Sequence, residues 1–125
     1  MQDSTGPRIL VVEESVLVAM ELETVLAERG FEVVTAGNLM AAYMMLDTGT
    51  FAAGIVSSVL PDGRGEDLAR ELLAKGLPTA LLVGWQDASA GAGLERARRF
   101  AKPIDDRQIV EWLERVLAPT GMGDQ

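Results

Sequence analysis

The chain has 125 residues, 48% of them hydrophobic and 24% charged, which is enough for one hydrophobic core and too apolar for wholesale disorder. Nineteen acidic against eleven basic side chains give a net charge of -8, which argues against a surface that follows nucleic-acid phosphates. Histidine and cysteine are both absent, so disulfides, zinc sites with these ligands, Ser–His nucleophilic pairs and phosphohistidine are excluded.

No stretch of the chain has the pattern of a signal peptide or a membrane anchor. No wholly apolar run approaches the roughly 18 residues that a membrane span requires. We therefore expect a cytoplasmic protein that does not bind membranes. We expect one domain over residues 8–118, with a disordered N-terminus at 1–7 and a disordered tail at 119–125.

The first half of the chain alternates between short apolar runs and amphipathic stretches. A continuous apolar run at 9–12 predicts a strand that is buried on both faces. Apolar residues at helical spacing over 18–26, followed by Gly30, predict a helix with a glycine after its C-terminus. Residues 31–36 predict a second strand, and Asn38 is placed to cap a helix that extends to Leu46.

The same alternation continues to the end of the domain. The predicted order is strand, turn, helix, strand, strand and helix, at 53–56, 60–63, 66–75, 79–83, 99–101 and 105–117. Asp105 is the expected N-cap of the last helix, with Gln108 three residues later. Three methionines of the second helix are expected to fill the core: Met40, Met44 and Met45.

Five strands that alternate with helices predict an α/β sandwich, with a parallel sheet flanked by about five helices. In such sheets the functional crevice lies beyond the C-terminal ends of the strands. Polar residues follow three of the predicted strands: Glu13 and Glu14, Ser57 and Ser58, and Lys102. These residues are therefore the first candidates for a functional site.

Three segments resemble the receiver domains of two-component response regulators: Ile9–Glu14, Leu60–Gly65 and Lys102–Pro103. The resemblance implies a flavodoxin-like sheet of order 2-1-3-4-5, with an aspartate phosphorylated at the end of the third strand. The stretch at 78–85 is also similar to a variant subgroup that carries Phe-Ala-Thr-Gly-Tyr. Within this motif Gly84 is identical, and Trp85 replaces the tyrosine.

The resemblance also assigns roles to individual positions. Glu13 and Glu14 match the acidic pair that holds Mg²⁺, and Lys102 matches the lysine that pairs with the phosphoryl group. The phosphoacceptor position, four residues before the proline of Leu60–Gly65, is occupied by Ser57. A serine hydroxyl is neutral, no histidine can activate it, and Mg²⁺ has lost one of three carboxylates. We therefore expect no catalytic residue, no required cofactor, and at most weak Mg²⁺ binding.

Two switch positions of the family are also altered. The hydroxyl residue expected five positions after Pro78 is Val83, and the aromatic expected three positions before the lysine is Arg99. Valine cannot donate a hydrogen bond to a phosphoryl group, and arginine is not an aromatic rotamer switch. Both changes predict a receiver that no longer responds to phosphate.

We therefore expect a non-enzymatic, degenerate receiver of a phosphorelay that acts by binding a protein, either a histidine kinase or an output regulator. Nucleic acid is not an expected partner, and a homodimer is left open. The alternatives are a weakly active phosphoacceptor or a nucleotide- or flavin-binding protein, although Glu13 and Glu14 would repel an anionic cofactor. The candidate interface residues are Trp85, Arg96, Arg98 and Trp112.

Simpler structural roles compete with these functional ones. Glu13 and Glu14 would also complement the positive N-terminus of the first helix, without any ligand. Lys102 would then be a local ion-pair partner of Glu14, or of Glu13, and would replace the charge of the metal. Trp112 would be a packing residue of the last helix.

Overall fold

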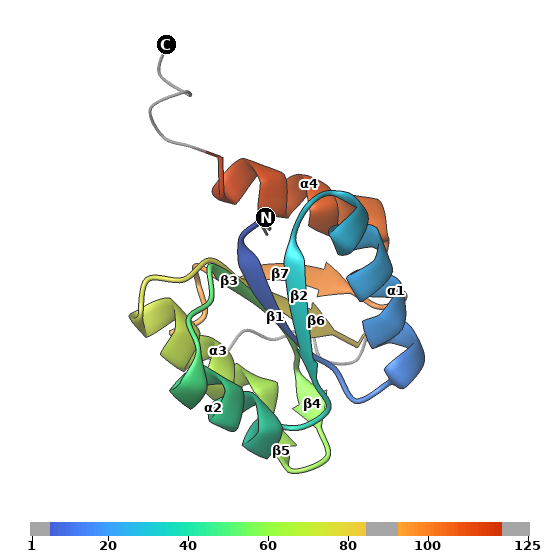
Figure 1. Ribbon diagram of the computed structural model, residues 1–125. Coiled ribbons are helices and arrows are strands. Elements are labelled where there is room, and N and C mark those ends of the chain that lie inside the picture. Colours follow the sequence, from blue (N-terminus) through green and yellow to red (C-terminus); the bar gives the residue numbers. More distant parts are fainter. Residues whose placement is uncertain (1–5, 85–92, 119–125) are drawn as a thin grey trace.

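The computed structural model describes residues 6–84 and 93–118, and its centre is a five-stranded parallel sheet (Figure 1). The strands are β1 (Arg8–Val12), β2 (Glu32–Ala36), β3 (Ala53–Ser57), β6 (Thr79–Val83) and β7 (Arg98–Ala101). Their order across the sheet is β2-β1-β3-β6-β7, which is the predicted topology. All residues of β3 and β6 are buried, because helices cover both faces of the sheet.

Four helices form the outer layers: α1 (Val16–Glu28), α2 (Leu39–Thr48), α3 (Gly65–Ala74) and α4 (Asp106–Val116). Helices α1 and α4 cover one face of the sheet, and α2 and α3 cover the other (Figure 1). Alternate residues of β1 divide between two cores, because successive strand residues point to opposite faces. Ile9 and Val11 pack with α1 and α4, whereas Leu10 and Val12 pack with α2 and α3.

Side-chain caps define where three of the helices begin. The hydroxyl of Ser15 accepts a hydrogen bond from the backbone N–H of Val18, and Asn38 accepts one in the same way at α2. Asp105 caps α4 by accepting from the N–H of Arg107. Gly30 follows α1 with a φ of 92°, a left-handed conformation that glycine adopts without steric cost.

A short antiparallel hairpin, β4 (Val59–Leu60) and β5 (Gly63–Arg64), follows β3 directly. The start of α3 then returns to the end of β3, where the N–H of Gly65 donates to the carbonyl of Ser58 at 2.9 Å. A Cβ at Gly65 would lie 1.8 Å from the carbonyl oxygen of Ser57, so only glycine permits this approach. This contact fixes the backbone that carries Ser57 and Ser58.

The helical layers differ from the sequence prediction in two respects. Four helices are present within 6–84 and 93–118 where about five were expected, and residues 85–92 lie outside the described residues. The prediction that Met40 and Met44 fill the core was wrong, because these side chains are 68% and 63% exposed. The pattern of α2 is apolar all around, so spacing alone could not show which face is buried.

The two predicted tails, 1–7 and 119–125, are only partly described. Residues 119–125 and the first five residues lie outside the described residues. The carbonyl of Pro7 accepts a hydrogen bond of 3.0 Å from the N–H of Glu32, which joins the chain just before β1 to β2. No helix in the described part of the chain is long and apolar enough to cross a membrane.

Candidate functional site

The C-terminal ends of β1, β3 and β7 bring three polar side chains together. Glu13 follows β1, Ser57 is the last residue of β3, and Lys102 follows β7. Backbone hydrogen bonds continue the sheet at this edge, since the N–H of Glu13 donates to Ala36 and that of Lys102 donates to Val83, both at 2.9 Å. The sheet thus holds the three residues at one place, although they are far apart in sequence.

Lys102 links the other two residues of this site. Its ammonium lies 3.1 Å from Oε1 of Glu13 and donates a hydrogen bond of 3.2 Å to Oγ of Ser57. The Ser57 hydroxyl donates in turn to the carbonyl of Val59 at 3.4 Å. The side chain of Glu13 is only 1% exposed and that of Lys102 is 35% exposed, so the ion pair is shielded on the carboxylate side. A buried carboxylate is thus neutralised from within the protein.

The two oxygens of Glu13 have different surroundings. Oε2 accepts a hydrogen bond of 2.9 Å from the backbone N–H of Ser15, just before α1. Oε1 is buried and makes no directed hydrogen bond, so its stabilisation comes from the nearby Lys102 charge. The carboxylate therefore complements the N-terminus of α1 and the ammonium at the same time.

The acidic pair does not provide the donor set that Mg²⁺ prefers. Magnesium takes near-octahedral oxygen ligands, usually including one or two carboxylates that are free to coordinate. Here both oxygens of Glu13 face protein groups, Glu14 is exposed, and Ser57 offers a hydroxyl, not a carboxylate. Residues 6–84 and 93–118 contain no group of three His, Cys, Asp or Glu side chains that could hold a metal. The residues present therefore do not fit Mg²⁺.

Of the two glutamates that the sequence offers as partners of Lys102, the structure selects Glu13. Lys102 pairs with Glu13, while Glu14 is exposed at the start of α1. Successive residues at a strand end point to opposite sides, so only one glutamate of the pair can face Lys102. Sequence spacing did not indicate which of the two it would be.

Val83 and Arg99, which the resemblance assigns to switch positions, lie on neighbouring strands. Val83 ends β6 and is 7% exposed, and Arg99 lies on β7 opposite Leu81. The Nε and Nη2 atoms of Arg99 are buried without a hydrogen-bond partner in the described part of the chain. Val83 therefore offers no hydroxyl and Arg99 no aromatic ring at these two places in the sheet.

The candidate interface residues separate into different environments. Trp112 is only 6% exposed and packs edge-to-face on Phe100 with 6.1 Å between ring centroids, so its assignment to the interface was wrong. The amphipathic pattern of α4 could not separate a buried from a half-exposed tryptophan. Arg98 is exposed, with its guanidinium 5.0 Å from the centre of the Phe100 ring, and Arg96 is also exposed. Trp85 lies outside the described residues.

Sequence reasoning missed a contact between the hairpin and α2. The carboxylate of Asp62, in the turn between β4 and β5, accepts hydrogen bonds from the N–H groups of Leu39 and Met40 at 2.8 and 3.0 Å. These backbone donors hold the pKa of Asp62 below its ordinary value. From the sequence, Asp62 is expected only in a turn. No local pattern links it to a helix that begins more than twenty residues earlier.

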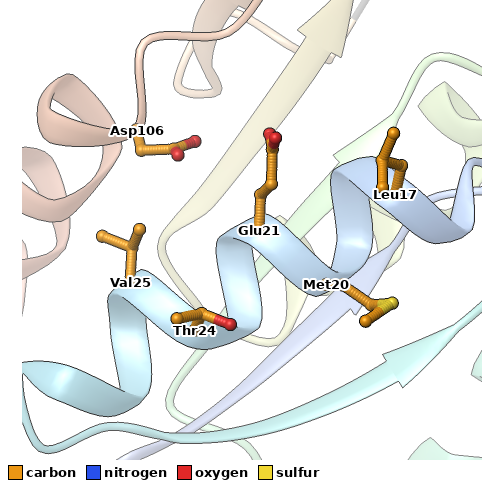
Figure 2. A pocket seen from close by; sticks show the side chains of 6 residues that line it. All are labelled: Leu17, Met20, Glu21, Thr24, Val25 and Asp106. Atoms are coloured by element: carbon orange, nitrogen blue, oxygen red, sulfur yellow. The ribbon is translucent and has the colours of Figure 1, made fainter.

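A cleft of about 420 Å³ lies between α1 and the start of α4, near the site formed by Glu13, Ser57 and Lys102 (Figure 2). It is lined by Leu17, Met20, Glu21, Thr24, Val25 and Asp106. A second hollow, of about 190 Å³, shares Glu21 and Asp106 with this cleft and extends to Lys102 and Pro103. The cleft therefore continues to the edge of the candidate site.

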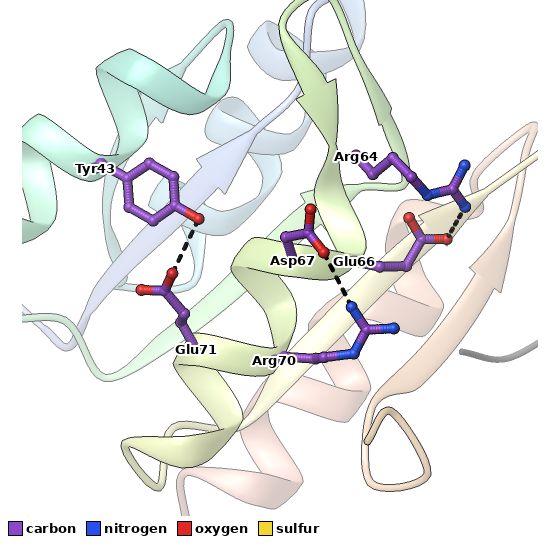
Figure 3. A network of polar contacts seen from close by, with 6 residues as sticks. All are labelled: Tyr43, Arg64, Glu66, Asp67, Arg70 and Glu71. Carbon is purple, nitrogen blue, oxygen red and sulfur yellow. Dashed lines mark hydrogen bonds and ion pairs between the residues drawn. The ribbon is translucent and has the colours of Figure 1, made fainter. Parts of the chain in front are cut away.

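On the face of the sheet that α2 and α3 cover, polar contacts connect these two helices and the hairpin (Figure 3). Tyr43 donates to Glu71 at 3.2 Å, and burial together with the Glu71 charge raises the pKa of the tyrosine. Arg64 pairs with Glu66 at 2.9 Å. Glu66 is 6% exposed and its Oε1 has no hydrogen-bond partner among the described residues. The sequence analysis did not single out this buried glutamate, because it sits in an otherwise solvated charge run.

Comparison with known proteins places this geometry in a family. No family model matches the sequence, and no curated protein matches it. Among solved structures, a response regulator from Chloroflexus aurantiacus J-10-fl is 30% identical, with a TM-score of 0.79 over 92% of this chain and 100% of that one. A sensor protein from Polaromonas sp. JS666 is 25% identical, with a TM-score of 0.76 over 87% and 94% of the two chains.

A CheY-like receiver domain from Methylobacillus flagellatus shares the fold at 22% identity, with a TM-score of 0.78 over 90% of this chain and 99% of that one. The sheet order, the polar residues at the strand ends and the full-length similarity to the Chloroflexus protein agree with one another. The chain belongs to the receiver-domain family of two-component response regulators.

Proposed function

We propose that this receiver domain works without aspartyl phosphorylation, as a non-enzymatic module that binds a partner protein of a signalling pathway. The partner would be a histidine kinase or an output regulator. The observation that supports the proposal is the position of Lys102, whose ammonium contacts both Glu13 and Ser57. In this arrangement a side chain of the protein supplies the positive charge that a metal would otherwise bring.

Ser57 is poorly suited to attack phosphorus. Its hydroxyl proton is directed to the Val59 carbonyl, and its oxygen accepts from Lys102. The residue is only 2% exposed, and an ammonium that is paired with a carboxylate cannot act as a general base. We therefore propose that no phosphoryl group is accepted at this position and that no Mg²⁺ is required.

Incubation with acetyl phosphate and Mg²⁺, followed by intact-mass measurement, tests this proposal. We expect an unmodified mass, while a receiver with an intact aspartate, treated in parallel, gains one phosphoryl group. A phosphoryl group mapped to Ser57 would show a residual phosphoacceptor and overturn the proposal. Modification of Asp62 would also overturn it, by showing that the acceptor has moved along the chain.

A further inference from the structure

Two side chains of opposite charge, Glu66 at the start of α3 and Arg99 on β7, have buried polar atoms that are not satisfied. Oε1 of Glu66 is buried and accepts no hydrogen bond among the described residues, and buried Nε and Nη2 of Arg99 donate none to them. These two nitrogens form the edge of the guanidinium that binds both oxygens of a carboxylate. A buried polar atom without a hydrogen bond is costly, so each side chain has a physical reason to pair with the other.

Arg99 points to the face of the sheet that α3 covers. The guanidinium of Arg98 lies 5.0 Å from the centre of the Phe100 ring, and Phe100 belongs to the core shared with α1 and α4. Successive residues of a strand point to opposite faces, so Arg99 points to the other face. Its neighbour across the ladder, Leu81 of β6, belongs to the core that α3 helps to form.

Glu66 lies on the flank of α3 that is turned away from α2. Tyr43 of α2 donates to Glu71, and Figure 3 shows Glu66 on the other side of α3 from this contact. Arg70, four residues after Glu66 and therefore on the same side of the helix, lies beside Gly93, whose Cβ position would be 3.5 Å from Cδ of Arg70. In the sheet α2 packs on β1 and β2, and α3 on β3 and β6, so the flank away from α2 is the flank toward β7.

An exposed arginine holds Glu66 in the structure. Nη2 of Arg64 donates a hydrogen bond of 2.9 Å to Oε2 of Glu66. The side chain of Arg64 is 64% exposed, whereas that of Glu66 is 7% exposed. Water solvates an exposed guanidinium well, so Arg64 can leave this pair at little cost in free energy.

We infer that Glu66 exchanges its partner between two arginines, Arg64 and Arg99. In the exchanged state both oxygens of Glu66 accept hydrogen bonds from Nε and Nη2 of Arg99, and Arg64 turns into solvent. The exchange satisfies three buried atoms and gives up one ion pair that has an exposed arm.

The exchange connects the hairpin to the edge of the sheet. Arg64 ends β5, Glu66 lies in the first turn of α3, and Arg99 belongs to β7, which is an edge strand. An acidic side chain of another protein that pairs with Arg64 would release Glu66, and Glu66 would then draw Arg99 inward. The inference thus goes beyond the proposed function, because it describes a response at β7 to a contact made at the hairpin.

Arg64→Gln tests the inference, because it removes the competing cation from the full chain. The measured quantities are the ¹⁵Nε–¹Hε signal of Arg99 and the hydrogen-exchange rate of this group, with Arg99→Lys identifying the signal. We expect Arg64→Gln to shift the signal and to slow the exchange at least about tenfold, because a bidentate pair protects the Nε–H group from water. The double variant Arg64→Gln/Glu66→Met should return both quantities to their wild-type values, since methionine has a similar shape and no charge.

Arg107→Gln is the matched control on the opposite face of the sheet. Arg107 is 86% exposed, and its ion-pair partner Asp105 lies two residues away, as Glu66 does from Arg64. We expect this variant to leave the Arg99 signal unchanged. Thermal melting of every variant separates a lost pair from lost folding.

A second readout keeps Glu66 intact and follows its carboxyl ¹³C signal. Arg99→Met should shift this signal more in the Arg64→Gln background than in the wild-type background, because only there is Glu66 paired with Arg99. Equal shifts in the two backgrounds would contradict the exchange even if the Glu66→Met variant failed to fold.

Three results with the Arg99 signal would overturn the inference. One is an identical signal in Arg64→Gln and the wild-type protein. Another is a shift that persists in Arg64→Gln/Glu66→Met, because a different acid would then hold Arg99. The third is an equal response to Arg107→Gln, which would show a general effect of net charge. None of these results depends on the acetyl phosphate experiment, so the inference and the proposed function can fail separately.

Discussion

At the scale of single residues, the ion pair of Lys102 with Glu13 should contribute measurably to stability. Lys102→Met leaves a carboxylate that is 1% exposed without its cation, and the Ser57 hydroxyl without its donor. We expect the free energy of unfolding to fall by roughly 1–3 kcal/mol, because an uncompensated buried charge is costly. Urea denaturation measures this change.

The other lysine of the chain provides the control for this experiment. Lys75 is exposed at the end of α3, so Lys75→Met should leave the free energy of unfolding nearly unchanged. Millimolar Mg²⁺ should stabilise the Lys102→Met variant more than the wild-type protein, because the carboxylate is then free. Equal stability of the Lys102→Met and wild-type proteins would show that the lysine is simply solvated.

Asp62 gives a pH-dependent prediction at the same scale. Its pKa is lower in the folded protein because the N–H groups of Leu39 and Met40 donate to it. The carboxylate therefore stabilises the fold above the ordinary aspartate pKa, and this contribution is lost as the pH falls through the lowered value. Asp62→Asn should reduce the melting temperature at neutral pH and have little effect in strong acid. Melting curves at both pH values decide the point, and a pH-independent loss would contradict it.

At the scale of elements, Trp112 fixes α4 on the sheet. It is 6% exposed, it contacts the ring of Phe100, and it belongs to the core formed with α1. Trp112→Ala should lower the free energy of unfolding by about 3–5 kcal/mol, as expected for truncation of a large buried ring. Val116→Ala on the same helix, at a side chain that is 38% exposed, should cost much less. Similar losses for both variants would show that α4 is held by other contacts.

The separate strands and helices show how far the sequence could predict the structure. The strands were predicted to within about one residue because buried strands read as continuous apolar runs, and 79–83 agrees with β6 at both ends. The buried faces of α1 and α2 were harder to predict, because apolar residues occur on all sides of these helices. The pattern therefore did not show that Leu17 and Met40 are exposed. The contact of Asp62 with α2 depends on tertiary packing, so no local rule could predict it.

At the scale of the whole molecule, the candidate site was predictable in its location and only partly in its contacts. Parallel strands bring their C-terminal ends to one edge, so Glu13, Ser57 and Lys102 had to lie near one another. Which glutamate meets the lysine depends on the exact twist and register of the sheet. The cleft between α1 and the start of α4 is a further product of packing, since it forms only when α4 returns beside α1.

An aspartate placed at position 57 tests how much receiver chemistry this site can support. Ser57→Asp would place a second carboxylate against Lys102, which already pairs with Glu13. The added like-charge repulsion should lower the melting temperature without metal, and Mg²⁺ should recover the loss by bridging the carboxylates. Ser57→Asn, which has nearly the same shape and no charge, should not respond to Mg²⁺. An equal Mg²⁺ response of both variants would contradict a restored metal site.

Metal binding and switching should nevertheless separate in the Ser57→Asp variant. Val83 has no hydroxyl that could follow a phosphoryl group, and Arg99, at the position that the resemblance assigns to a moving aromatic, has no ring. Beryllofluoride with Mg²⁺, a stable mimic of the phosphorylated state, should therefore shift amide signals only near Glu13, Glu14 and residue 57. The comparison is an amide spectrum of the variant with and without the mimic. Shifts that spread through β7 into α4 would show that the fold still transmits the signal, through contacts that need neither the hydroxyl nor the aromatic ring.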